Sequence, residues 1–361
     1  MNIAFFIGSL GGGGAERVVC NLSNHLIRKG HKIEILTMSD ANAGYELDEA
    51  VKKTCLLNAN ERKNIIVDNS LRVIRFIKHM KSNCADCYVV MLPETTILML
   101  LFRKCTKAKV VAAERVDPNS YSWIKKSLIK KIAHNADRWV FQTEDIKKWY
   151  KNVVEDEKGV VIPNAINEVF IRQPYNGKKE KRIVGIGRLT DQKNFSLLID
   201  SFSMIADDFP DYSLVIYGEG AKRKELEEKV RKLKLTNRVA LPGYVDDIVE
   251  QLEKSTLFVL SSDYEGMPNA LMEAMALGLP CISTDCGGGG ARFLIEEGKN
   301  GLIVPVNDAC KLGTAIRIVL TNKDLRDTIA NNAKKITDQL SPTVIYGKWE
   351  QVIVNVKGNR L

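Results

Sequence analysis

Short apolar segments alternate with amphipathic segments along the whole chain. Brief aliphatic runs predict buried parallel strands, and segments with apolar residues three or four positions apart predict helices. In the first half we expect helices at Glu16–Lys29, Asn69–Lys81 and Ser122–Ala133, and strands at Ile3–Ile7, Lys32–Thr37, Cys87–Leu92, Lys109–Ala113 and Arg138–Gln142. A further strand with a Pro-Asn turn, 159–164, closes this half. The alternation is typical of a parallel sheet with crossover helices.

A second strand–helix series begins after a polar linker, 173–181. Its expected strands are Arg182–Gly187, Ser213–Tyr217, Val239–Leu241, Leu257–Ser261 and Pro280–Thr284, and its expected helices are Phe195–Asp207, Ala221–Lys232, Ile248–Lys254, Asn269–Leu277 and Asp308–Leu320. The 361 residues exceed what one hydrophobic core usually holds.

We therefore predict an α/β chain of two doubly wound, Rossmann-like domains, residues 1–165 and 166–341, with a C-terminal helix, 342–361, packing back on the first. Ligands of such sheets bind beyond the carboxyl ends of the strands. Two sheets that face each other would create a central cleft for a ligand.

The apolar pattern predicts neither a secretory leader nor a membrane-spanning helix. The first residues lack a basic leader and a small-residue cleavage site, and the longest apolar stretch, Tyr88–Phe102, is shorter than the ~20 residues of a spanning helix. Among eight cysteines only Cys84 and Cys87 have metal or dithiol spacing, and no second pair or nearby His completes a site. We expect reduced thiols in a cytoplasmic protein.

The net charge of +9 is placed unevenly. Residues 1–165 hold 26 Lys and Arg against 18 Asp and Glu, whereas the remainder is almost neutral. Two basic amphipathic segments, 72–81 and 123–131, fit peripheral contact with an anionic membrane surface, and equally fit core-packed helices with solvated lysines. Aromatic residues are not interleaved with the basic runs, so no nucleic-acid partner is expected.

The segment 263–280 carries the most informative chemistry. It follows an apolar strand and therefore leaves the sheet at its carboxyl edge; Gly266 permits a tight turn, and Pro268 suits the first turn of a helix. The free amides at such a helix start favour phosphate; here they belong to Asn269, Ala270 and Leu271.

Two carboxylates, Glu265 and Glu273, lie eight positions apart in this segment, one before the helix and one within it. One carboxylate can accept hydrogen bonds from ribose hydroxyls while the other faces a sugar. The alternative is an exposed acidic loop followed by a surface glutamate.

Two further loops carry candidate chemistry, and each follows the first strand of one of the expected domains. Arg188 and Lys193 supply a planar fork and a point charge, the cations that a diphosphate leaving group needs where no metal is present. Solvated surface side chains are the alternative for this pair. The glycine run 11–14, including Gly13 and Gly14, permits close approach to an anion or sugar, or forms a plain turn.

These segments, in this order and spacing, resemble the retaining GT-B glycosyltransferases of the large group 1 family. The quoted stretches are "LGGGGAERVV", "ADRWVFQTE", "VIPNAI", "GRLTDQKNF", "PGYVDDI" and "SSDYEGMPNALMEAMALGLPCISTDC", which span almost the whole chain. The Glu-x7-Glu element is their specific part. The residues around this element are most similar to those of bacterial enzymes that build cell-surface polysaccharides from UDP-sugars.

The resemblance implies a role for each matching residue. Glu265, Arg188 and Lys193 match the groups nearest the reaction, at the donor sugar and the diphosphate, and Glu273 matches the ribose-binding Glu. The remaining donor-side matches are Gly13 and Gly14 and, more loosely, Tyr244 at the base. We expect the helix start, Met267, Asn269, Ala270 and Leu271, to bind the donor as well. The implied reaction moves a hexose or N-acetylhexosamine from a UDP-sugar to a glycan acceptor, lipid-linked in type, with retention and without a cofactor.

The sequence also departs from the family pattern. The loop in which relatives often carry an acceptor-side His has none, and the polar residues Glu114, Arg115 and Asp117 stand there instead. The glycine run 287–290 lacks the Glu that often follows it, and we expect a flexible turn near the donor. No D-x-D motif is present, so no catalytic metal is expected.

Other functions remain open from the sequence. One is a catalytically silent module that binds a nucleotide or acts as a scaffold, and another is a sugar-nucleotide epimerase or a polymer synthase on the same architecture.

Overall fold

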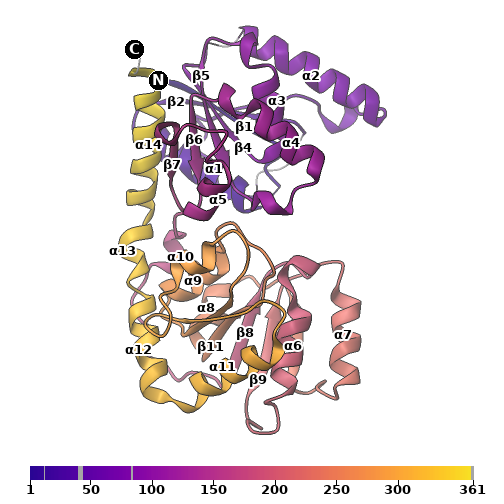
Figure 1. Cartoon of the computed structure of the whole chain (residues 1–361), viewed down its shortest axis with the longest axis vertical. Helices are drawn as coiled ribbons and strands as arrows, with labels where there is room; N and C mark the ends of the chain where they lie inside the picture. The colour runs from indigo at the N-terminus through magenta and orange to yellow at the C-terminus, as the bar shows by residue number, and fades with distance from the viewer. Residues whose placement is uncertain (12, 40–43, 83, 359–361) are drawn as a thin grey trace. The chain divides into compact units, whose positions relative to one another are not determined.

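The computed structural model describes residues 1–11, 13–39, 44–82 and 84–358. Gly12 of the glycine run and the last three residues of the expected C-terminal helix, 359–361, lie outside the described residues. The chain forms two compact units (Figure 1). Unit 1 comprises Met1–Ala165 and Thr343–Leu361, and unit 2 comprises Ile166–Pro342.

Unit 1 is built on a seven-stranded parallel sheet of order β3-β2-β1-β4-β5-β6-β7. Its strands are β1 (Asn2–Ile7), β2 (Lys32–Thr37), β3 (Lys52–Cys55), β4 (Cys87–Met91), β5 (Lys109–Glu114), β6 (Arg138–Phe141) and β7 (Gly159–Val161). Its helices are α1 (Gly14–Arg28), α2 (Ile65–Ser82), α3 (Pro93–Leu101), α4 (Trp123–Ile132), α5 (Glu144–Trp149) and α14 (Pro342–Gly358).

The core of unit 1 forms where helices cover the strands. Phe6 of β1 stacks on Phe76 of α2, with ring centroids 4.6 Å apart. On α14, Trp349 and Ile353 are fully buried although this helix follows unit 2 in the sequence. The apolar side of α14 thus contributes large side chains to the core of unit 1.

Unit 2 contains a six-stranded parallel sheet of order β10-β9-β8-β11-β12-β13. Its strands are β8 (Arg182–Ile186), β9 (Ser213–Tyr217), β10 (Val239–Gly243), β11 (Leu257–Leu260), β12 (Cys281–Thr284) and β13 (Leu302–Val304). Its helices are α6 (Phe195–Ser203), α7 (Arg223–Lys232), α8 (Ile248–Lys254), α9 (Asn269–Ala276), α10 (Gly290–Leu294), α11 (Ala309–Thr321), α12 (Lys323–Ala333) and α13 (Ile336–Leu340).

The strand order of unit 2 reverses between β8 and β11. The chain proceeds from β8 outward to β10 on one side, and then returns to pair β11 with β8 on the other. Such a switch point opens a crevice at the carboxyl ends of the two strands, because their crossover helices pass to opposite faces of the sheet.

Several elements differ from the sequence expectations. The edge strand β3 was not expected, because its residues Lys52–Cys55 are polar and partly exposed. In the glycine run 287–290, Gly288 and Gly289 form a turn, as expected, and Gly290 begins the short helix α10. The flexibility of this turn stays a prediction. Among the described residues, no helix combines the length and apolar character required to cross a bilayer.

We predict that Trp349→Ala destabilises unit 1 by about 3–5 kcal/mol, because it removes a fully buried indole from the core. Val344→Ala, at a position on the same helix that is 38% exposed, is the matched control and changes stability by less than about 0.5 kcal/mol. Denaturant unfolding followed by near-ultraviolet circular dichroism measures both. Equal midpoints for the two variants would contradict a core role for α14.

Candidate active site

Three loops meet at the carboxyl edge of the unit 2 sheet. The first, 187–194, follows β8; the second, 261–268, follows β11; the third, 285–290, follows β12. A parallel bridge between Tyr264 and Gly287 joins the second and third loops. The loops after β8 and β11 flank the switch point, where a ligand of such a sheet is expected.

Lys193 and Glu265 form an ion pair across the first two loops. Lys193 Nζ lies 2.6 Å from Glu265 Oε1, and their side chains are only 16% and 10% exposed. Ser262 Oγ donates to the same carboxylate oxygen at 2.8 Å, and the amide of Glu265 donates to the Gly287 carbonyl at 2.9 Å. The structure thus joins two predicted site residues that are 72 positions apart in the sequence.

Asn194 holds the Lys193 loop against the Glu265 loop. Its backbone adopts the left-handed conformation, φ 43°, and its side-chain oxygen caps α6 by accepting from the Leu197 amide. Asn194 Nδ2 donates to Asp263 Oδ1 and to Asn307 Oδ1, each at 2.8 Å. This one amide side chain therefore connects the first two loops with a further loop, after β13, that contains Asn307.

The loops of the site approach one another so closely that a Cβ atom would clash at two glycine positions. A Cβ placed on Gly290 would lie 2.1 Å from the Gly266 carbonyl oxygen and 2.6 Å from Pro268 Cδ. A Cβ on Gly187 would lie 2.9 Å from Lys193 Cε. Glycine at these two positions lets α10 pack against the turn before α9 and lets the Lys193 stem lie across the end of β8.

Helix α9 begins where the sequence predicted a helix start. Pro268 occupies its N-cap, and Asn269 and Ala270, the first two helical residues, are partly exposed at this edge. Met267 and Leu271 are buried beside them. Glu273 lies one turn into α9 and is partly buried, with an interaction of its own. The positive end of the helix is thus accessible beside Glu265.

Arg188 is exposed and makes no ion pair with any residue that the structure describes, which distinguishes it from Lys193. Tyr244, expected at the base, is 77% exposed after β10. Cys286 is buried next to the site, and burial together with the Glu265 charge raises the pKa of its thiol to about 12. It remains a neutral thiol near the carboxylate.

The structure gives the acceptor-side candidates of unit 1 internal partners. Glu114 is buried at the end of β5 and accepts from the hydroxyls of Tyr121 and Tyr150 at 2.6 and 2.5 Å. Burial raises the pKa of this carboxyl, against the lowering effect of its donors. A role for Glu114 at an acceptor stays a prediction, and the contacts observed are those of a structural carboxylate.

The two neighbours of Glu114 in this loop are also buried. Arg115 donates to Asn164, and burial lowers the pKa of its guanidinium to about 10. Asp117 accepts from the Asn119 amide at 2.9 Å and so caps a short 3-10 helix. Their proposed acceptor contacts likewise stay predictions.

Gly13 and Gly14 lie in unit 1 and begin α1. Gly13 is the N-cap and Gly14 the first helical residue, and both are exposed. Their amides provide a helix start without side chains, which suits an anion but does not by itself identify one.

Sequence reasoning missed three residues that shape the site: Ser262, Asn194 and Gly290. Ser262 had the detectable signal of a hydroxyl placed directly after a buried strand. For Asn194 the detectable signal was an Asn directly before an expected helix. Gly290 had none beyond the glycine run, because its role depends on a contact with a loop far away in the sequence.

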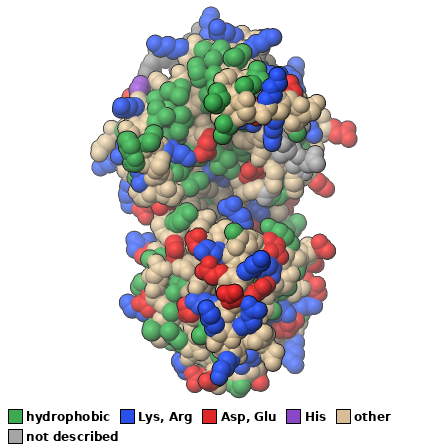
Figure 2. All heavy atoms as spheres, turned by 90° about the vertical axis from the view of Figure 1, so that its right-hand side faces the viewer, with side chains coloured by type: hydrophobic (Ala, Val, Ile, Leu, Met, Phe, Trp, Pro, Cys, Tyr) green, Lys and Arg blue, Asp and Glu red, His purple; other side chains and the backbone are tan. Residues whose placement is uncertain are grey.

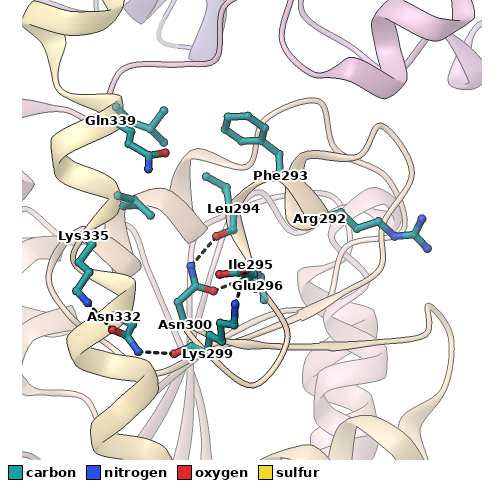
Figure 3. Close-up of a pocket in the computed structure, with 12 residues that line it drawn as sticks. Arg292, Phe293, Leu294, Ile295, Glu296, Lys299, Asn300, Asn332, Lys335 and Gln339 are labelled. Atoms are coloured by element: carbon teal, nitrogen blue, oxygen red, sulfur yellow. Dashed lines mark hydrogen bonds and ion pairs between the residues drawn. The ribbon is translucent and has the colours of Figure 1, made fainter.

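Figure 3 shows a different pocket of unit 2, with a volume of about 480 Å³, between α10 and the helices α12 and α13. Asn332 donates to the Lys299 carbonyl at its base, and Phe293 lies at its rim. None of the predicted site residues lines this pocket. Within the described residues no cluster of three His, Cys, Asp or Glu side chains could hold a metal ion.

Two family models match adjoining parts of the chain. The model described as "Glycosyl transferases group 1" matches residues 167–336, and the model described as "Glycosyltransferase Family 4" matches residues 12–169. Together they extend over both units.

Curated relatives match over nearly the full length. The chain is 26% identical to a Campylobacter jejuni GalNAc-alpha-(1->4)-GalNAc-alpha-(1->3)-diNAcBac-PP-undecaprenol alpha-1,4-N-acetyl-D-galactosaminyltransferase, over 99% of each chain. It is 28% identical to an N-acetylgalactosamine-N,N'-diacetylbacillosaminyl-diphospho-undecaprenol 4-alpha-N-acetylgalactosaminyltransferase of the same organism, covering 92% of this chain and 93% of the relative.

Solved structures share the fold at lower identity. Anabaena HepE in complex with UDP and glucose matches with a TM-score of 0.85 and 18% identity, over 98% of this chain and all of that one. Sucrose-phosphate synthase from Thermosynechococcus elongatus matches with a TM-score of 0.84 and 18% identity, over 99% of each. These likenesses confirm the predicted fold of two α/β domains with parallel sheets.

We predict that Gly290→Ala lowers the stability of unit 2 by about 1–3 kcal/mol, because its Cβ would overlap the Gly266 carbonyl and force the two loops apart. Gly347→Ala is the matched control, since a Cβ there meets nothing within 4 Å. Thermal unfolding compares the two variants with the parent chain. A Gly290→Ala chain as stable as the parent would show that this loop contact is not tight in solution.

Proposed function

The chain belongs to the group 1 glycosyltransferases, and we propose that it moves a hexose or N-acetylhexosamine from a UDP-sugar to a lipid-linked glycan during assembly of a cell-surface polysaccharide or oligosaccharide. The undecaprenol-linked acceptors in the names of the two Campylobacter relatives support the acceptor class. The UDP bound in the HepE structure supports the nucleotide. In this proposal the enzyme works without a metal at the cytoplasmic face of the membrane.

The observation that carries the proposal is the Lys193–Glu265 pair, with Arg188 unpaired nearby in the sequence and the start of α9 beside the carboxylate. This edge of the sheet can attract a diphosphate in two ways. It would take its charge from Arg188 and Lys193 and hydrogen bonds from the first amides of α9. In this proposal Glu273, one turn further, accepts hydrogen bonds from the ribose.

The reaction breaks the bond between the anomeric carbon and the oxygen of the β-phosphate, and the electron pair of that bond leaves with UDP. Negative charge grows on the diphosphate, where Arg188 and Lys193 stabilise it. Positive charge grows on the sugar ring. Glu265, held by Lys193 and Ser262, keeps its carboxylate where it can accept from sugar hydroxyls.

For a retaining outcome, the acceptor hydroxyl attacks the anomeric carbon from the side that UDP leaves. The new bond forms between the acceptor oxygen and the anomeric carbon, and the hydroxyl proton passes to an oxygen of the departing phosphate. The buried side chain of Glu114 is then not required as a base, in keeping with its two tyrosine partners.

We predict that Glu265→Gln and Lys193→Ala each lower turnover of the UDP-sugar by at least about 100-fold, because each removes a charge that acts during bond cleavage. UDP release in the presence of a lipid-linked glycan acceptor measures this effect. Glu265→Gln keeps an oxygen that can accept from Lys193, so a loss there reflects the charge more than the fold.

The matched control for these variants is Lys229→Ala, which removes the lysine of the Lys229–Asp200 ion pair in the same unit, away from the three loops. It should retain turnover within about threefold. Full activity of both Glu265→Gln and Lys193→Ala would refute the assigned site, and a loss equal to theirs in Lys229→Ala would show that only folding is being measured.

A second prediction concerns the nucleotide. UDP at 100 times its dissociation constant should stabilise unit 2 by about 2.7 kcal/mol, because only the folded site binds it. Thermal-shift measurements with UDP, GDP and ADP rank the bases, and Arg188→Ala should reduce the UDP shift. An equal shift from all three nucleotides, or an undiminished shift in Arg188→Ala, would contradict this account of the pocket. A chain that binds UDP but releases none from any sugar donor would be a silent module.

A further inference from the structure

Helices α2, α3 and α4 of unit 1 present large apolar side chains to solvent. They lie next to one another on one side of the sheet (Figure 1), and Lys125 of α4 forms an ion pair with Glu94 of α3 at 2.6 Å. We call the following set of exposed side chains on these helices the α2–α4 face: Ile65, Ile66, Ile74, Leu101, Trp123 and Ile124.

The exposure on this face is far greater than packing needs. Trp123 is 78% exposed, and Ile65 and Ile66 are 76% and 77% exposed, so the tips of α4 and α2 project almost whole apolar side chains. Ile129 and Ile132 of α4 are 1% and 9% exposed and supply the core contacts of that helix. Clusters of this kind in a soluble domain mark a binding surface.

The charge around the face is mainly positive. Residues 62–131 contain 15 Lys and Arg but only five Asp and Glu, so this segment carries more than the net charge of the whole chain. Each of its five carboxylates is buried or paired with a lysine; they are Asp68, Asp86, Glu94, Glu114 and Asp117. Figure 2 views this side and shows hydrophobic side chains among Lys and Arg over the upper half.

Not all of the basic residues expected to face a membrane are free to do so. Arg75 in the segment 72–81 pairs with Glu61 at 2.6 Å, and Arg72 donates to the Met38 carbonyl at 3.1 Å. Within residues 62–131, the exposed lysines that make no ion pair with a described residue are Lys63, Lys78, Lys81, Lys104, Lys107, Lys130 and Lys131. These lysines, with the apolar tips, define what the face can bind.

We propose that the α2–α4 face inserts Trp123, Ile124, Ile65 and Ile66 into the headgroup region of an anionic bilayer, with the lysines holding the surface. Trp favours the boundary between headgroups and acyl chains, and lysine stems reach outward from such a depth. A protein partner fits less well, because protein interfaces are depleted in Lys. The inference rests on the proposed function only in its purpose, which is to bring the site to a lipid-linked acceptor.

Tryptophan fluorescence of the full chain tests the proposal directly. Among four tryptophans, Trp139 and Trp349 are fully buried and Trp149 is partly buried under Lys130, whereas Trp123 is exposed. Vesicles of equal parts phosphatidylglycerol and phosphatidylcholine should shift the emission to shorter wavelength at low salt, and brominated lipid should quench it. Trp123→Ser should abolish both responses.

Co-sedimentation with the same vesicles measures the contributions separately. Trp123→Ser with Ile124→Ser, and Ile65→Ser with Ile66→Ser, should each lower the partition coefficient at least tenfold. Lys131→Gln should lower it about fivefold, which is the loss of ~1 kcal/mol for one lysine. The matched control removes two exposed apolar side chains of unit 2, Met204→Ser with Ile318→Ser, and should leave binding unchanged.

Three results would overturn the proposal: no sedimentation at low salt, equal binding to pure phosphatidylcholine, or undiminished binding by both apolar double variants. A blue shift that depends on protein concentration without vesicles would assign the face to a second copy of the chain instead. Because binding is measured without nucleotide, a chain that binds vesicles yet transfers no sugar refutes the proposed function alone. A chain that transfers sugar to a water-soluble acceptor but ignores vesicles refutes the face alone.

Discussion

Two opposite charges held largely out of water, on Lys193 and Glu265, are the constraint around which unit 2 is organised. Removing both groups from solvent is costly, and the pair compensates only if its geometry is held closely. At 2.6 Å, with Ser262 donating to the same oxygen, that geometry is present before any ligand arrives. A phosphate would find a lysine already ordered, and a sugar would find a carboxylate already fixed in place.

The fold supplies this geometry through the reversal of strand order. Because β11 pairs with β8, loops separated by some 70 residues of sequence emerge side by side at one edge. Asn194 connects them by hydrogen bonds, and Gly290 allows a third loop to lie against Gly266. Rigid strands and braced loops place the charged groups, and we propose that unit 1 binds the acceptor.

Much of this could be predicted from the sequence. The strands were visible because buried parallel strands are continuous apolar runs, and Ser213–Tyr217 was predicted to the residue. The positions of Glu265 and Lys193 followed from motifs after such strands. The ion pair between them did not, since it depends on which strands are neighbours. The ion pair between Arg75 and Glu61 could not be predicted either, because the sequence shows that a helix residue is basic but not which carboxylate it will meet.

A crystal structure of the chain with UDP is the decisive experiment for this site. We predict diphosphate oxygens within hydrogen-bond distance of both Arg188 and Lys193, at the start of α9, with the ribose at Glu273. A diphosphate bound elsewhere, for example in the pocket between α10 and α12, with the Lys193–Glu265 contact undisturbed and Arg188 still in solvent, would contradict this prediction.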